Sequence, residues 1–181
     1  MDKKASVFTD GGNFRWNVWA PLKANYHAWR AESGKLAAKV AFAKWGIRVL
    51  EVKCSRCSLR DEMTDHMLAD CIWARSVWWN LCRWVKIPIL TEDISVAQIL
   101  NHFQSQIGSK RWKRAVHLVA LCCLWRWWLA RNNKEFNGIM EPVRRIVESI
   151  KEDSFLWVKS RVKGVYLEWK NWVDLDIASI V

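Results

Sequence analysis

Residues 54–71 read CSRCSLRDEMTDHMLADC, which places Cys54, Cys57, His66 and Cys71 in one short stretch of the chain. Three thiols and one imidazole at this spacing are typical of a closed, tetrahedral zinc site. The short interval between Cys54 and Cys57 lets both sulfurs face one ion. His66 and Cys71 lie just over one helical turn apart, so a turn that breaks or tightens brings both to the same ion. We therefore predict one structural Zn²⁺ ion held by these four ligands.

The residues around the ligands favour metal binding. Lys53 and Arg56 are positive and favour the thiolate form of the cysteines, which is the form that binds metal. The polar residues 58–65 predict a solvated loop. Asp65 or Asp70 is expected to orient the imidazole. Two alternatives remain, a reduced cysteine cluster without metal and a disulfide pair.

The other cysteines have a different explanation. Cys82, Cys122 and Cys123 lie in apolar surroundings, and we expect them in the core. The N-terminal residues lack the apolar segment of a signal peptide, so we expect an intracellular protein of the nucleus or cytoplasm, not a secreted one. Disulfides are rare in such compartments. No stretch of sequence has the length and apolarity of a membrane span.

The charge of the chain favours an anionic partner. The 181 residues carry a formal net charge of +11, and residues 1–53 contain ten basic and four acidic residues. Such a field attracts phosphate backbones, so RNA or DNA is the expected partner. The residues predicted to contact it are Lys23, Arg30, Lys35, Lys39, Lys44, Arg48, Lys53 and Arg56.

Fifteen tryptophans are the second unusual feature of the composition. Tryptophan stacks on unpaired bases, but rings spaced along amphipathic helices usually pack in the core. We expect most of them to be core residues, with one or two exposed ones at most as candidates for base contacts.

The pattern of apolar residues predicts an all-α fold. Turn residues separate the helices, and no segment shows the alternation of a strand. The start of the helix at Lys110 is basic, which opposes the helix dipole, so this turn faces either a phosphate or water. The predicted helices are one beginning at Pro21 and ending at Ser33-Gly34, then 35–44, 72–85, 94–107, 110–133, one beginning at Pro142, and a last turn at 167–172.

The chain resembles the reverse transcriptase zinc-binding domain of plant non-LTR (LINE-type) retrotransposons. The resemblance begins at Trp16, Trp19, Pro21-Leu22-Lys23, Asn25 and Trp29-Arg30, and continues through Gly46-Ile47, the four zinc ligands, Ala74 and Val77-Trp78. Further matches are Trp125, Trp128, Arg131-Asn132, Phe136, Phe155, Trp157, Arg161, Trp169 and Trp172. Together they cover about residues 14–172. The chain departs from the family at Ser55, where a proline is usual, at residues 37–42, and at Trp45, where an arginine is usual.

The resemblance and the residues together predict the organisation of the chain. A lead-in (1–13) precedes a reverse transcriptase zinc-binding domain (14–88) and a helical C-terminal region (89–181). We expect a small zinc-knuckle-like module embedded between helices, followed by a helical tail packed on it.

Two functions are consistent with this organisation. The first is a non-catalytic module that binds nucleic acid, with a reverse transcriptase domain as a possible partner. The second is a helical protein–protein interaction module with a structural zinc site. An enzyme is not expected, because both tyrosines lack the following aspartate pair that metal-dependent nucleotidyl transfer needs. A lone pair, Asp174 and Asp176, lies near the end of the sequence.

Overall fold

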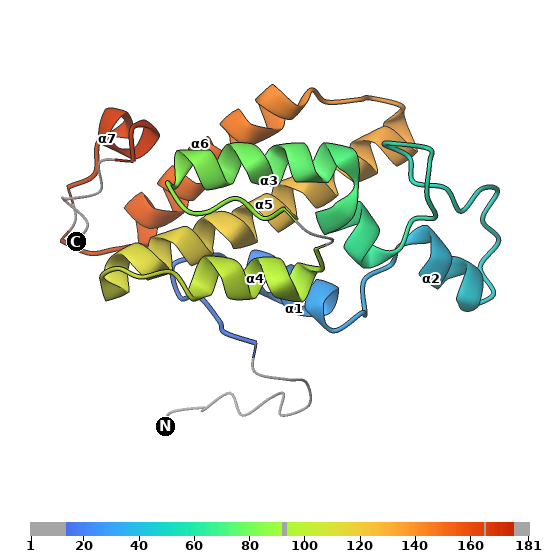
Figure 1. Cartoon of the computed structure of the whole chain (residues 1–181), viewed down its shortest axis with the longest axis horizontal. Helices are drawn as coiled ribbons and strands as arrows, with labels where there is room; N and C mark the ends of the chain where they lie inside the picture. The colour runs from blue at the N-terminus through green and yellow to red at the C-terminus, as the bar shows by residue number, and fades with distance from the viewer. Residues whose placement is uncertain (1–13, 92–93, 165, 176–181) are drawn as a thin grey trace.

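The computed structural model describes residues 14–91, 94–164 and 166–175, and within these ranges the chain is helical and contains no β-strand. The predicted all-α class is therefore confirmed. The helices, coloured in chain order in Figure 1, are α1 (Leu22–Glu32), α2 (Lys39–Lys44), the short π-helix η1 (His66–Asp70), α3 (Ile72–Trp84), α4 (Val96–Gln104), α5 (Lys110–Asn137), α6 (Val143–Arg161) and α7 (Trp169–Val173).

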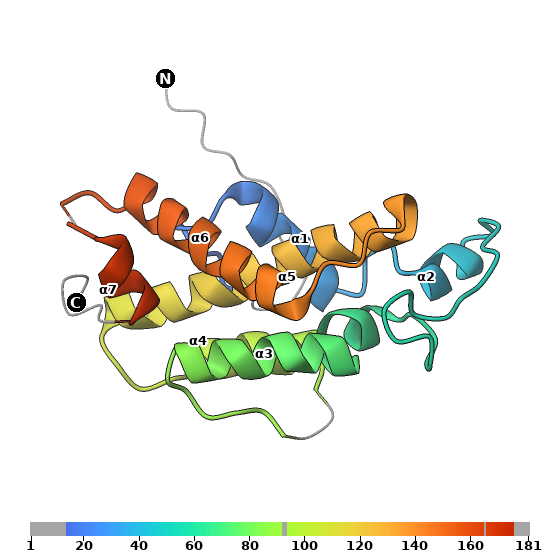
Figure 2. The same cartoon turned by 90° about the horizontal axis from the view of Figure 1, so that it is seen from above.

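Helix α5 forms the centre of the molecule. Residues 115–124 of this helix are all buried, as expected for an apolar segment that is covered by neighbours on every side. Figure 2 shows α3 and α4 on one side of α5, with α1 and α6 on the other. The core cysteines agree with the sequence analysis, since Cys82, Cys122 and Cys123 are all buried.

Three helices differ in length from their predictions by four residues or more. Helix α4 covers Val96–Gln104 instead of 94–107, and the side chain of Ser95 caps its start by accepting the amide of Gln98. The differences at α5 and α2 also have local causes. Helix α5 continues to Asn137, because Gly138 ends it with a left-handed φ of 71° that other residues rarely adopt. Helix α2 begins at Lys39 instead of residue 35. The chain leaves α1 through Gly34, and the side chain of Arg30 donates two hydrogen bonds of 2.8 and 3.1 Å to the carbonyl of Lys35. Gly34 and Lys35 therefore belong to the turn that ends α1, and α2 starts only after it.

One hydrophobic core includes residues from both predicted domains. The indole of Trp127 on α5 donates a hydrogen bond of 2.6 Å to the carbonyl of Met67 on η1. The indole of Trp84 on α3 donates one of 2.9 Å to the carbonyl of Val173, at the end of α7. The helical tail is thus packed on the cysteine-containing module.

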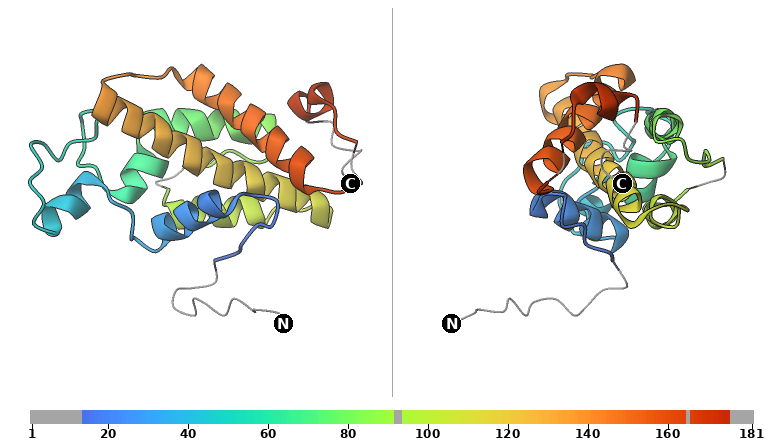
Figure 3. Two further views of the ribbon diagram at one scale, coloured as in Figure 1. Left: turned by 180° about the vertical axis from the view of Figure 1, so that it is seen from behind. Right: turned by 90° about the vertical axis from the view of Figure 1, so that its left-hand side faces the viewer.

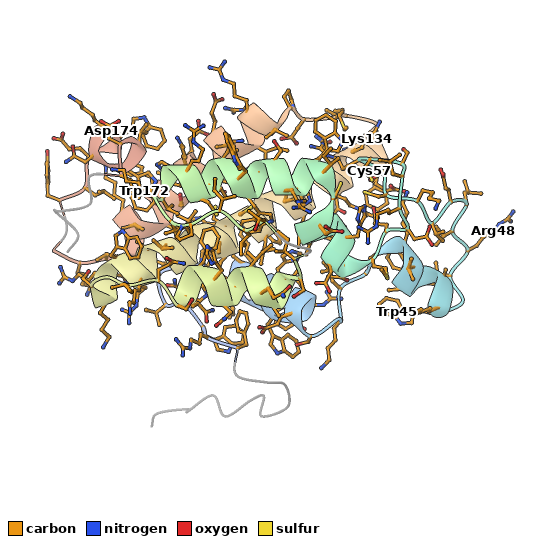
Figure 4. All side chains as sticks on the ribbon, viewed as in Figure 1. Trp45, Arg48, Cys57, Lys134, Trp172 and Asp174 are labelled. Atoms are coloured by element: carbon orange, nitrogen blue, oxygen red, sulfur yellow. The ribbon has the colours of Figure 1, made fainter. Side chains whose placement is uncertain are left out.

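The cysteine-containing loop and α7 lie at opposite ends of the molecule. Figure 3 shows the elongated bundle from behind and end-on, and Figure 4 places Trp45 and Arg48 at one end and Trp172 and Asp174 at the other. Within the described residues, no helix combines the length and the apolar character that crossing a bilayer requires.

Two buried histidines make the stability of the bundle depend on pH. Burial, assisted by Arg30, lowers the pKa of His27 from 6.5 to about 4. His27 lies between the rings of Trp125 and Trp128, and its Nε2 has no hydrogen-bond partner. Burial, assisted by Arg15, likewise lowers the pKa of His117 to about 4. The unfolded chain therefore takes up protons near pH 6.5, whereas the folded chain resists them until about pH 4.

We expect the free energy of unfolding to fall as the pH drops from 6.5 towards 4, by about 2–3 kcal/mol for each histidine at pH 4.5. Urea unfolding at neutral and acid pH measures this. A His27→Phe variant, which removes one titrating group, should lose less stability on acidification than the wild type. Comparing the two cancels any contribution from metal release. An identical pH dependence in both proteins would contradict the assignment.

Candidate metal centre

A short pair of backbone contacts fixes the position of the first cysteine. The amide of Cys54 donates to the carbonyl of Arg60 at 2.9 Å, and the amide of Glu62 donates to the carbonyl of Val52 at 2.8 Å. Between these contacts the chain turns back at Ser58, which has a left-handed φ of 56°. The loop thereby brings Cys54 and Cys57 onto the same side.

The other two ligands are positioned by η1. The amide of Cys71 bonds to the carbonyl of His66 at 2.7 Å, five residues earlier, which is the spacing of a π-helical turn. The turn between His66 and Cys71 is expected to break or tighten. In the structure it is wider, with π-helical spacing, and it ends at Cys71. The extended ψ of 136° at Cys71 then separates η1 from α3. This wider turn returns residue 71 to the side of the chain on which His66 lies.

The four predicted ligands meet at one point. One donor atom of each residue lies within 4.8 Å of the donor atoms of the other three. The sulfurs of Cys54 and Cys71 are 4.0 Å apart, and the sulfur of Cys57 is 3.3 Å from Nε2 of His66. A tetrahedral Zn²⁺ site requires about 3.8 Å between two sulfurs and about 3.5 Å between sulfur and nitrogen. These two donor–donor distances are therefore close to those of a tetrahedral zinc site.

The surroundings of the sulfurs favour thiolates. The hydrogen bond with Cys71 lowers the pKa of Cys54 to about 4, and the backbone amides of Arg56 and Cys57 act in the same direction. The same pairing, together with burial, raises the pKa of Cys71, so a metal-free pair shares one proton. A divalent cation would replace that proton. The amide of Trp73, in the first turn of α3, faces Cys71 and favours its thiolate.

The imidazole of His66 is also oriented for a metal. Its Nε2 faces Cys57, whereas its buried Nδ1 has no hydrogen-bond partner and lies 3.9 Å from a carboxylate oxygen of Asp70. A small closure of this gap gives the carboxylate–histidine–metal arrangement common at zinc sites. Asp65, the alternative partner, instead accepts the amide of Val96 at 2.9 Å, just before α4. The structure therefore selects Asp70.

These observations fit a resident zinc ion of the structural type. Cys54, His66 and Cys71 are buried, and Cys57 is partly exposed. Solvent approaches through a surface hollow of about 460 Å³ that Cys57 and His66 line. With four protein donors, no coordination position is left for a substrate.

Arg56 does not lie where a phosphate contact would. Its side chain is buried, and its guanidinium lies 4.7 Å from the ring centre of Trp127. One nitrogen donates to the carbonyl of Glu141 at 3.1 Å. Its positive charge acts on the Cys54 and Cys71 sulfurs, and a Zn²⁺ site with three thiolates carries one net negative charge. Arg56 is thus placed to balance the metal centre.

The loop between the ligands is less solvated than predicted, because Glu62 is fully buried. Its carboxylate is held by the guanidinium of Arg131 on α5, with Nε 3.2 Å from one oxygen. Lys39, predicted to contact nucleic acid, is also buried and pairs with Glu135 of α5 at 2.9 Å. These charges attach the loop and α2 to α5, so Lys39 is not free to meet a phosphate.

The remaining predicted contacts are distributed over α1, α2 and the segments that follow these helices. Lys23 lies over the ring of Trp125 and Lys35 over that of Trp29. Arg30 donates to the carbonyl of Lys35 beyond the end of α1, and Lys53 pairs with Asp61 at 2.9 Å. Lys44 and Arg48 are exposed and form no ion pair with a described residue; Arg48 projects outward at the tip (Figure 4). The structure does not bring the eight residues into one cluster.

Five tryptophans of the described residues are exposed, so exposure alone does not single out one or two candidates for base contacts. Those with more than a third of their surface accessible are Trp16, Trp45, Trp73, Trp79 and Trp169. Most of the others pack in or against the core, in agreement with the prediction. Helical periodicity could not identify Trp16 and Trp45, because both lie outside helices.

Comparison with known proteins supports the metal centre. Residues 2–78, less than half of the chain, match the family described as zinc-binding in reverse transcriptase. This match covers all four ligands and ends within α3. No curated protein and no solved structure matches the chain significantly.

Proposed function

We propose that the chain is a zinc-stabilised module that binds RNA or DNA and derives from the C-terminal part of a non-LTR retrotransposon reverse transcriptase protein. Its natural partner would be the polymerase domain of such a protein or the nucleic acid held by that domain. The proposal is supported by the match to a reverse transcriptase zinc-binding family and by the net charge of +11.

The single observation that carries the proposal is the closed cluster of four donor atoms within 4.8 Å. Such a site stabilises a fold and offers no position for an activated water. We therefore propose a binding role and no polymerase activity for this chain. Asp174 is exposed at the end of α7, and Asp176 lies outside the described residues. Purified protein is expected not to extend a primed RNA template with magnesium or manganese.

Binding to nucleic acid should depend steeply on salt. Each phosphate contact releases counterions, so affinity for a labelled single strand is expected to fall more than about tenfold between 50 and 200 mM salt. Filter binding across a salt series measures this. Absence of binding at low salt would overturn the nucleic-acid role.

One observation favours a second function, a protein-docking module. Near the tip, a hollow of about 480 Å³ is lined by apolar side chains that include Ile47, Leu50 and Phe136. Leu50 is 95 % exposed, and exposed apolar groups of this kind often mark protein interfaces. If nucleic acid does not bind at low salt, this surface becomes the favoured one.

A further inference from the structure

One part of the surface carries positive charge without compensation. Residues 94–134 contain seven lysines and arginines and no aspartate or glutamate, and residues 11–31 contain no acidic residue either. Of the seven, Arg126 and Arg131 pair with carboxylates of other elements, so the uncompensated charge is that of the start of α5. The described parts of these two segments pack against each other, because α1 contacts both α4 and α5. By contrast, the arginines at the start of α6 are paired with glutamates of the same helix.

Hydrogen bonds and ring contacts bring the two acid-free segments together. The side chain of Asn17 donates to the carbonyl of Arg114 at 2.8 Å, and the guanidinium of Arg114 lies 5.4 Å from the ring centre of Trp19. Arg15 is close enough to His117 to lower its pKa. Figure 3 shows α1 beside the middle of α5, where Lys23 lies over Trp125 and His27 contacts Trp125 and Trp128. The start of α5 therefore adjoins the segment that leads into α1.

The cations at the start of α5, together with Arg15, Lys23 and Arg30, form no ion pair with a carboxylate of the described residues, in contrast to Arg126 and Arg131. Arg15, Lys110 and Arg111 are exposed. Four basic residues in the first turn of α5 repel one another and oppose the helix dipole, which is unfavourable unless an anion neutralises them. We call this region the α1/α5 basic face, defined by Arg15, Trp16, Lys23, Tyr26, Arg30, Lys110, Arg111, Lys113 and Arg114.

Aromatic side chains are interleaved with these charges. Trp16 is 50 % exposed and directly follows Arg15. Tyr26 is 47 % exposed on α1. It lies three residues after Lys23 and four before Arg30, so all three share one helix face. Exposed rings beside cations suit unpaired bases, which stack while the cations contact the phosphates. Duplex DNA would leave these rings without stacking partners.

We propose that the α1/α5 basic face binds single-stranded nucleic acid, with Trp16 and Tyr26 stacking on bases and Arg15, Lys110 and Arg111 contacting phosphates. This inference rests on the proposed nucleic-acid role. It assigns that role to a surface formed by α1 and the start of α5, instead of to the residues around the metal.

The test compares matched variants in filter binding to a labelled oligothymidylate, an oligouridylate and a duplex of equal length. The variant Arg15→Gln/Lys110→Gln/Arg111→Gln should reduce the salt slope by about 2, since each single-strand phosphate contact contributes about 0.7. The control Arg144→Gln/Arg145→Gln/Arg161→Gln removes the same charge from α6 and should leave the slope unchanged. Trp16→Ala should weaken single-strand binding about 5- to 100-fold, whereas Trp169→Ala, which removes a ring of similar exposure on α7, should not.

The outcomes separate this inference from the wider function. If the wild type binds but the basic-face variants lose no more affinity than the α6 and α7 controls, the inference is overturned. The nucleic-acid role would then remain in place. If the protein prefers the duplex, and the triple arginine and lysine variant loses affinity while Trp16→Ala does not, the assignment to single strands is overturned. No wild-type binding to any of the three probes would overturn both.

Discussion

Replacing Cys71 by serine is expected to abolish zinc binding and to unfold residues 54–71. Structural zinc contributes about 10–16 kcal/mol of apparent binding free energy in small zinc peptides. Here the metal would hold residues 54–65, of which only Cys54 and Cys57 belong to the hydrophobic core or pack against it. The four donors cluster within 4.8 Å, so losing one opens the site. The central helix should survive, because residues 115–124 are buried among other helices.

Hydrogen exchange with elemental analysis measures this result. In Cys71→Ser, the amides of Cys54, Glu62 and Met67 should lose protection, while those of residues 118–124 remain protected. Cys82→Ala is the matched control, because Cys82 is equally buried but lies on α3 away from the cluster. It should retain one zinc per chain. Equal zinc content in both variants would contradict the ligand assignment.

Replacing Arg131 by methionine is expected to cost about 3–5 kcal/mol of stability, the second-largest effect of a single change. Glu62 is completely inaccessible and Arg131 nearly so, and the carboxylate would be left charged and buried without its partner. The loop that carries the metal ligands is attached to α5 through this pair, so its protection from exchange should also fall.

Urea unfolding tests this expectation with two controls. Arg144→Met removes an exposed arginine paired with Glu148 at 3.0 Å, and it should cost less than about 1 kcal/mol. Glu62→Gln/Arg131→Met removes both charges and should cost less than Arg131→Met alone. If Arg131→Met were no more destabilising than Arg144→Met, the buried pair would not have the structural role assigned to it.

The ligand set and the helices could be predicted because both depend on local sequence. The spacing of Cys54, Cys57, His66 and Cys71 reflects the short-range geometry that a tetrahedral ion imposes. Apolar periodicity similarly identified the long helices. Their ends were harder to place, as at Gly138, where one left-handed residue decides how far α5 extends.

Long-range pairing could not be predicted from local patterns. Glu62 and Arg131 are separated by 69 residues, and a carboxylate in a polar loop normally indicates exposure to solvent. Arg56 was interpreted as a phosphate contact because it is basic and beside a ligand, yet it is buried against Trp127. The basic face also depends on tertiary packing, which brings Arg15 beside the start of α5.

X-ray absorption at the zinc edge, on protein purified without chelator and analysed for metal content, tests the central claim most directly. We predict one zinc per chain, with three sulfurs at about 2.3 Å and one nitrogen at about 2.0 Å. A folded segment 54–71 without zinc would contradict the structural metal centre. A coordination shell in which water replaces a sulfur would contradict its closed, non-catalytic character.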